Sequence, residues 1–299
     1  MLQRRSNWGR WGPDDQLGTL NLIDGPKRAA AASLVRDGRS VSLSREIVPN
    51  KKDEAGAVTC DLSFHSLDSR SVAAMDYFGL SYHGFATTHI DALCHVWQDG
   101  KLWNDRDGAS EMDASGARWG DIEQWHSGVF TRGVLLDVPA HRGAAYVTPD
   151  RPVTGDELEQ ITRDQGLRID PGDALLIHSG RNQWNREQPP WETLGPRWAD
   201  RDAGGTRPGL HASCMEFLRD HDVAVLMWDM MDLSPSGYSF AWSVHAAIAA
   251  FGLAVVDNVQ FDDAVAVCRE LQRWEFLTVI APLRVRGGTG SPVNPLAVF

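Results

Sequence analysis

Apolar and polar positions change their spacing along the chain, and the change predicts strands alternating with helices from about residue 130 onward. Short apolar runs over residues 133–138, 173–178, 223–228 and 252–256 are typical of buried strands. Helical spacing covers residues 154–165, 211–221, 241–251 and 263–273, and residues 275–285 give a final strand. Thr154-Gly-Asp-Glu157 has the form of a capping box, and Gly252 fits a helix C-cap.

The first hundred residues are richer in strand than the rest, and residues 41–48 partly alternate between apolar and polar positions. The chain shows no low-complexity linker and no internal repeat. We therefore predict an α/β fold with a mixed sheet and flanking helices, formed by a single domain over residues 1–299.

Bulk composition excludes several classes of partner. The net charge of −11 leaves no basic surplus for phosphates, which argues against nucleic acid or an anionic membrane. The first residues contain no apolar run that would act as a secretory signal. The longest apolar stretch, residues 244–256, is too short to span a bilayer. Four cysteines form no C-x-x-C pair, and we expect a cytoplasmic protein with reduced thiols.

The strongest chemical signal is the pattern H-x-D-x-x-x-H formed by His89, Asp91 and His95. In an extended strand the side chains at i and i+2 point to the same face, so His89 and Asp91 can converge. A turn into helix after Asp91 would bring His95 back over the same point. Neutral imidazole and carboxylate suit a divalent cation such as zinc or manganese. For this motif alone, a core hydrogen-bonded pair of His and Asp is the plainer alternative.

Two further donors follow from the predicted elements. His245 lies within the otherwise apolar predicted helix over residues 241–251, where a polar group needs a partner. Asp257 directly follows the predicted strand over residues 252–256. Sites in α/β folds assemble at the carboxyl ends of strands. A satisfied core histidine and an exposed turn acid are the alternatives. Together with His89 and Asp91, these residues make a mixed nitrogen and oxygen metal site.

Twelve tryptophans are available to pack the core or to line an aromatic pocket. Trp97, two residues after His95, is the best candidate to contact a substrate. The chain contains no G-x-S-x-G elbow, no Walker A sequence and no Rossmann glycine fingerprint, which excludes the usual layouts of those chemistries.

Taken together, these segments resemble the cyclase family of metal-dependent hydrolases, which includes bacterial kynurenine formamidase and isatin hydrolase. The resemblance covers most of the chain. It rests on the opening Asn7-Trp-Gly-Arg-Trp-Gly-Pro-Asp-Asp-Gln-Leu-Gly-Thr-Leu-Asn-Leu22, the Thr88-His89-x-Asp91-x-x-x-His95 core, Arg132-Gly-Val-Leu-Leu-Asp137, Gly172-Asp-Ala-Leu-Leu176 and Gly287-Gly-Thr-Gly-Ser-Pro292. The resemblance implies a swivelling β/β/α domain and a homodimer or homotetramer.

The formamidase pattern reads H-x-G-T-H-x-D-x-P-x-H, and this chain departs from it. Phe85 stands where the first His would be, Thr87 replaces the Gly, and Leu93 replaces the Pro. The pattern also has a later His followed twelve residues on by Glu, which here gives His245 and Asp257. Loss of the first imidazole favours one divalent ion, Zn or Mn, over a metal pair. Phe85 would then form an apolar wall against which a flat substrate packs.

The resemblance implies hydrolysis of a small cyclic or aryl amide, such as a lactam or formamide, by attack of metal-activated water. A lactone is the next substrate class. His95 is the imidazole that we expect to transfer the proton. Because family membership does not fix a reaction, a cyclase, a dehydratase or a small-molecule binding protein of secondary metabolism on the same scaffold stays open.

Overall fold

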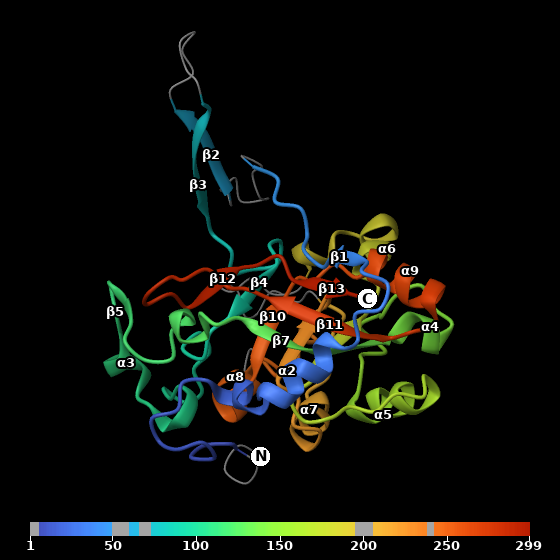
Figure 1. Cartoon of the computed structure of the whole chain (residues 1–299), viewed down its shortest axis with the longest axis horizontal. Coiled ribbons are helices and arrows are strands. Elements are labelled where there is room, and N and C mark those ends of the chain that lie inside the picture. Colours follow the sequence, from blue (N-terminus) through green and yellow to red (C-terminus); the bar gives the residue numbers. More distant parts are fainter. Residues whose placement is uncertain (1–5, 50–59, 66–72, 195–205, 238–241) are drawn as a thin grey trace.

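The computed structural model describes residues 6–49, 60–65, 73–194, 206–237 and 242–299. These residues form a large mixed sheet with helices around it, which confirms the predicted α/β class (Figure 1). The nine strands of this sheet lie in the order β1-β13-β11-β7-β8-β9-β10-β4-β12. Strands β7 to β10 pair in parallel, while the strands on either side of them pair antiparallel.

The strands of the large sheet are β1 (Ser40–Ser42), β4 (His89–Asp91), β7 (Val129–Asp137), β8 (Ala174–His178), β9 (Val225–Trp228), β10 (Ala254–Asp257), β11 (Glu275–Ile280), β12 (Gly290–Pro292) and β13 (Leu296–Val298). The helices are α2 (Gly25–Ala32), α3 (Gly108–Glu111), α4 (Val138–Arg142), α5 (Gly155–Asp164), α6 (Arg181–Glu187), α7 (Cys214–Asp220), α8 (Ala246–Phe251) and α9 (Asp262–Leu271). In the described part of the chain, four short 3-10 helices accompany them: Gly18–Leu22, Trp103–Asp105, Ile122–Trp125 and Trp191–Thr193.

The central strands are buried on both faces, as their continuous apolar runs predict. Leu135, Leu176, Leu226 and Val255, one from each parallel strand, are fully buried. The helix predicted from residue 154 begins where its capping box indicates, because the Thr154 hydroxyl accepts from the Glu157 N–H. These elements form the rigid frame that carries the site.

Three predicted elements differ from the observed ones. The strand expected over residues 41–48 is limited to β1, and the final strand ends at Ile280 instead of residue 285. The helix expected over residues 241–251 begins only at Ala246, and its expected first residue, 241, lies outside the described residues. Among the described residues, no helix is long and apolar enough to cross a bilayer.

A hairpin of β2 (Cys60–His65) and β3 (Met75–Leu80) extends away from the body of the molecule (Figure 1). Its outward part exposes four large apolar side chains, Phe64, Met75, Tyr77 and Phe78, each at least half exposed. An isolated two-stranded hairpin is marginally stable in water. The segment that follows β3 runs directly into the candidate site.

Candidate metal centre

Strand β4 carries the predicted motif and lies between β10 and β12. Its register places His89 opposite Asp257 of β10, and Asp91 opposite Gly290 of β12. Directly opposed residues of an antiparallel pair have neighbouring Cβ atoms. Because His89 and Asp91 are two residues apart on one strand, their side chains share a face. The sheet therefore brings His89, Asp91 and Asp257 to one place.

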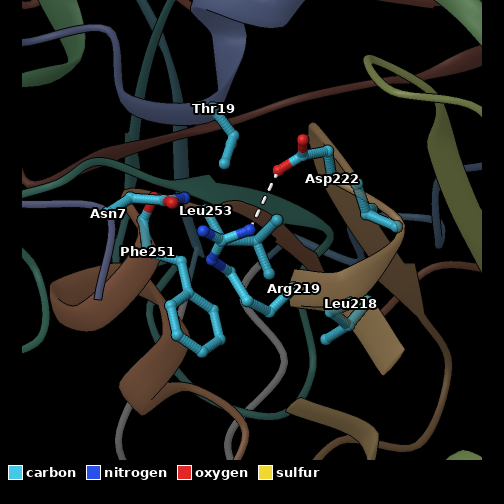
Figure 2. Close-up of a pocket in the computed structure, with 8 residues that line it drawn as sticks. Asn7, Thr19, Leu218, Arg219, Asp222, Phe251 and Leu253 are labelled. Atoms are coloured by element: carbon cyan, nitrogen blue, oxygen red, sulfur yellow. Dashed lines mark hydrogen bonds and ion pairs between the residues drawn. The ribbon is translucent and has the colours of Figure 1, made fainter. Parts of the chain in front are cut away.

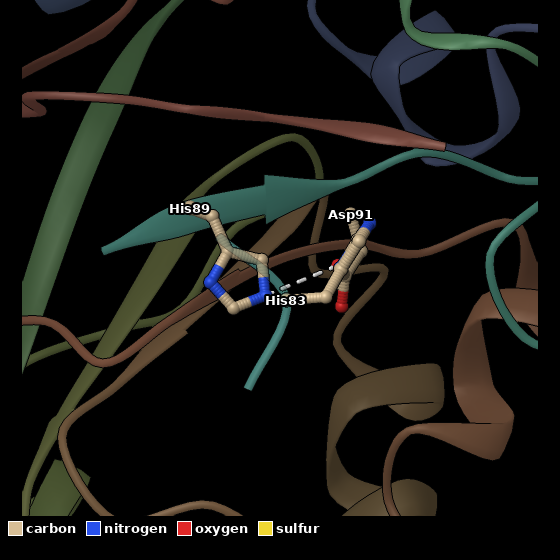
Figure 3. Close-up of side chains that lie close together, drawn as sticks. All are labelled: His83, His89 and Asp91. Atoms are coloured by element: carbon tan, nitrogen blue, oxygen red, sulfur yellow. Dashed lines mark ion pairs between the residues drawn. The ribbon is translucent and has the colours of Figure 1, made fainter. Parts of the chain in front are cut away.

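The fully buried Asp91 carboxylate lies at the centre of four imidazoles. Its Oδ1 is 3.1 Å from His83 Nδ1, 3.4 Å from His89 Nε2 and 3.7 Å from His95 Nε2. Its Oδ2 is 3.9 Å from His245 Nε2. Figure 3 shows His83 and His89 converging on this carboxylate. Neither Asp91 oxygen has a hydrogen-bond partner among the described residues.

His245 and Asp257 form the other side of the cluster and are held by further buried groups. His245 Nε2 is 3.0 Å from Asp257 Oδ2, and His89 Nε2 is 3.8 Å from the same oxygen. Asp232 Oδ2 pairs with His245 Nδ1, which leaves Nε2 facing the cluster. The indole N–H of Trp228 donates to Asp257 Oδ1 at 2.5 Å, which leaves Oδ2 free to face the imidazoles. Such outer contacts fix the orientation of metal ligands.

These donors fit a divalent cation. Two groups of three residues, His83/His89/Asp91 and Asp91/His245/Asp257, have ligand atoms that all lie within 4.8 Å of one another. Asp91 belongs to both groups. A buried carboxylate that makes no hydrogen bond is costly unless a charge compensates it. Imidazole nitrogen and carboxylate oxygen are the ligands that zinc and manganese accept.

The electrostatics of the cluster follow from the same contacts. Burial opposes protonation of His89, but Asp91 and Asp257 outweigh burial and raise the pKa of His89 to about 9. Burial also opposes ionisation of Asp91, yet the surrounding imidazoles hold its pKa well below its ordinary value. The pKa of His95 is lowered to about 4 by burial and by the neighbouring imidazoles, although Asp91 opposes this. His95 is thus neutral near pH 7.

The structure brings together the four residues predicted as metal ligands, and His95 lies beside them. The local position of His245 differs from the prediction: it is not inside the helix but directly precedes α8, as its N-cap residue. Asp232 contacts His245 on the side away from the cluster. Asp229 does not join the cluster, since its carboxylate accepts from the backbone N–H groups of residues 179–181.

The two predicted substrate contacts lie in different surroundings. Phe85 packs edge-on against Trp191 and near Trp242, whose ring is 5.2 Å from that of His245, so Phe85 lies one ring away from the cluster. The Arg207 guanidinium covers the Phe85 ring at 4.0 Å. Trp97 is 42% exposed, and its indole donates to the Cys94 carbonyl. Contact of either residue with a substrate stays a prediction.

His83 is the site residue that the sequence interpretation missed. Residues 81–88 form an irregular segment, so the spacing of His83 from His89 does not give the direction of its side chain. The only signal in the sequence was its position two residues before Phe85, where the formamidase pattern has an imidazole. Its ring stacks on that of His95, with centroids 3.9 Å apart and an interplanar angle of 2°.

A small cavity elsewhere in the molecule cannot hold a substrate. It has a volume of about 10 Å³, enough for about one water molecule, and its lining includes Asn7, Thr19, Arg219, Asp222 and Phe251 (Figure 2). Hydrogen bonds from Asn7 to the Phe251 carbonyl and from Thr19 to the Ala224 carbonyl fasten the N-terminal segment beside it. We interpret the cavity as a packing gap beneath that segment.

Comparison with known proteins places this architecture among solved folds. A crystal structure of a novel cyclase is 24% identical and covers 100% of this chain and 99% of that chain, with a TM-score of 0.86. An isatin hydrolase bound to the product analogue thioisatinate is 16% identical, and the match covers 93% of this chain and 98% of that chain with a TM-score of 0.61. Isatin hydrolase A from Labrenzia aggregata, bound to benzyl benzoate, is 17% identical, and the match covers 89% of this chain and 94% of that chain with a TM-score of 0.60.

A family model gives the same assignment at the level of sequence. The model described as "Putative cyclase" matches residues 40–235, which is more than half of the chain and includes β4 and the segment before it. No curated protein sequence matches the chain. The matched region contains the recognised motif of His89, Asp91 and His95. The chain therefore belongs to the cyclase family.

Proposed function

We propose that this protein is a metal-dependent hydrolase of a small cyclic or aryl amide, a lactam or formamide, with lactones as the next substrate class. The observation that carries the proposal is the buried Asp91 carboxylate, whose two oxygens make no hydrogen bond among the described residues while four imidazoles surround it. The fold-level likeness to an isatin hydrolase bound to a product analogue supports a cyclic amide.

One divalent ion, zinc or manganese, would be held by His89, Asp91, His245 and Asp257. When bound, such an ion lowers the pKa of a water molecule and polarises a substrate carbonyl. The protein itself positions these four ligands. Asp232 orients His245, and the register of β4 against β10 positions His89, Asp91 and Asp257.

His95 has the position and the protonation state for proton transfer. Its Nε2 is 3.7 Å from Asp91 Oδ1, and its side chain is 30% exposed, so it borders the cluster and can also reach the solvent side. His95 is neutral near pH 7, so it has a lone pair with which to accept a proton that it returns to a leaving nitrogen. Phe85 supplies an apolar ring, separated from His245 by the ring of Trp242, against which a flat substrate would pack.

The direct test combines metal analysis with a substrate panel. We expect about one divalent ion per chain, hydrolysis of a lactam or aryl formamide, and loss of hydrolysis on chelation that the metal restores. A metal-loaded protein that hydrolyses no amide or lactone but binds or dehydrates a panel compound would favour the binding-protein or cyclase alternative. Two ions about 3.5–4 Å apart in a metal-soaked crystal would refute the single-ion centre.

We further infer that the protein assembles with copies of itself, as a homodimer or homotetramer. The support is the projecting hairpin, which exposes Phe64, Met75, Tyr77 and Phe78 on a two-stranded ribbon. Light scattering of the intact chain tests the inference. We expect Phe64→Ser/Phe78→Ser to shift the mass towards the monomer, and a monomeric wild type would overturn it.

A further inference from the structure

The irregular segment before β4 adds an imidazole to the cluster that the family motif does not place there. The motif has its first imidazole at the position that Phe85 occupies in this chain. His83 lies two residues earlier, and its Nδ1 is 3.1 Å from Asp91 Oδ1. Building on the metal dependence proposed above, we propose that His83 is a further ligand of the single ion through Nδ1.

The first argument is the state of the two facing atoms. His83 Nδ1 is buried and, like both Asp91 oxygens, has no hydrogen-bond partner among the described residues, although Nδ1 and Oδ1 are close. Nδ1 and Oδ1 approach to 3.1 Å without hydrogen-bond geometry, so one cation between them would compensate both buried atoms. His83, His89 and Asp91 also have ligand atoms within 4.8 Å of one another.

The second argument is the tautomer. His83 Nε2 is 2.9 Å from the Thr289 hydroxyl oxygen. If Nε2 carries the proton and donates it to Thr289, Nδ1 keeps its lone pair and faces Asp91. Metal-ligating histidines usually donate their other N–H to such an acceptor, which fixes the ring and its tautomer. Thr289 is therefore the positioning residue for His83.

The third argument is the space that the fold reserves for this ring. Its plane is fixed by stacking on His95, and it makes a T-shaped contact with the ring of His89, with centroids 5.1 Å apart. Gly290 lies beneath it: a Cβ at this position would approach His83 Cε1 to 3.0 Å and the Ile90 carbonyl oxygen to 2.5 Å. The absence of a side chain at residue 290 thus leaves room for the imidazole.

The test measures metal binding itself, in addition to turnover. His83→Phe keeps a flat ring to stack on His95 but removes both nitrogens, and His83→Ala removes the ring. We expect each to weaken manganese or zinc binding by roughly 100-fold or more, measured by competition with a chromophoric chelator, and Thr289→Val by roughly 10–100-fold. Pulsed electron paramagnetic resonance of the manganese-loaded protein should show one fewer coupled imidazole nitrogen in His83→Phe.

Two controls separate this proposal from the proposed function. His126→Ala removes an exposed imidazole outside the cluster and should leave metal binding unchanged. Thermal unfolding of the metal-free variants shows whether each still folds. A wild type that binds no divalent ion would overturn the proposed function. A wild type that binds the ion, together with a folded His83→Phe of unchanged affinity and unchanged nitrogen count, would overturn the role of His83 alone.

Discussion

Replacement of Asp232 by Asn tests whether the buried contacts behind the cluster set its metal affinity. Asp232 is almost fully buried and accepts four hydrogen bonds. One oxygen accepts from Ser243 Oγ at 3.1 Å and from the backbone N–H groups of Val244 and His245. The other pairs with His245 Nδ1. The carboxylate therefore keeps a proton on His245 Nδ1. Nε2, which lies 3.0 Å from Asp257 Oδ2, is the nitrogen left for a metal.

An Asn side chain at residue 232 cannot accept from the backbone N–H groups and also accept from His245 Nδ1. If its oxygen faces the Val244 and His245 backbone N–H groups, its NH₂ group meets His245 Nδ1 and forces the proton onto Nε2, where a metal must bind. If it turns over, the NH₂ group meets the backbone donors instead. Loss of such outer partners weakens metal binding by roughly 10–100-fold, or about 1.4–2.8 kcal/mol. We therefore expect Asp232→Asn to fall in this range.

Chelator competition at fixed pH measures this loss, and Ser243→Ala is the matched control. That variant removes one donor to Asp232 but keeps the carboxylate and the pairing with His245, so its metal affinity should stay within about threefold of wild type. Thermal unfolding of metal-free protein checks that Asp232→Asn still folds. A folded Asp232→Asn that binds metal as tightly as wild type would refute the tautomer argument.

Three further results are expected. His95→Ala should lower kcat by roughly 10²–10⁴-fold but retain metal that His89→Ala loses, and equal metal loss in both variants would make His95 a ligand. Phe85→Ala should raise KM with metal content unchanged, and an unchanged KM would exclude a substrate wall. Burial opposes both charges of the His178–Asp137 pair, yet the pair raises the pKa of His178 and lowers that of Asp137. The contribution of this pair to the free energy of unfolding is greatest between about pH 4 and 6.5. It is lost as pH falls through the lowered pKa of Asp137, and it is lost as pH rises through the raised pKa of His178. Asp137→Asn should therefore destabilise the chain more at pH 5 than at pH 9 in denaturant titrations, and a larger effect at pH 9 would reverse that sign.

The order of the core elements could be predicted from the sequence because it depends on local patterns. The runs that became β7, β8, β9 and β10 are apolar throughout, and a strand buried on both faces leaves that signature wherever it lies. The short strands β4 and β12 carry no such signature, since three residues are too few for periodicity. Their places in the sheet depend on pairing with β10 and with each other, which no local pattern encodes.

The candidate site was predictable to the extent that its residues lie at regular spacing. His89 and Asp91 alternate on a strand, and His245 and Asp257 follow from a polar residue in an apolar run and from a strand end. His83 was not predictable, because it approaches Asp91 through an irregular segment in which spacing carries no direction. In the sequence, Trp228 is typical of a core residue. Only the hydrogen bond from its indole N–H to Asp257 shows that it also orients a candidate ligand.

The position of the cluster in the sheet explains why its donors come from distant parts of the sequence. Sites in parallel sheets gather at the carboxyl ends of strands, where Asp257 lies. Strand β4 runs antiparallel to β10, so its first residue, His89, is the one that meets that end. Asp91 then turns one oxygen towards the segment before β4 and the other towards His245. The two halves are anchored independently, by Thr289 behind His83 and by Asp232 behind His245. A substitution behind one half, such as Thr289→Val or Asp232→Asn, should therefore leave the hydrogen bonds of the other half intact.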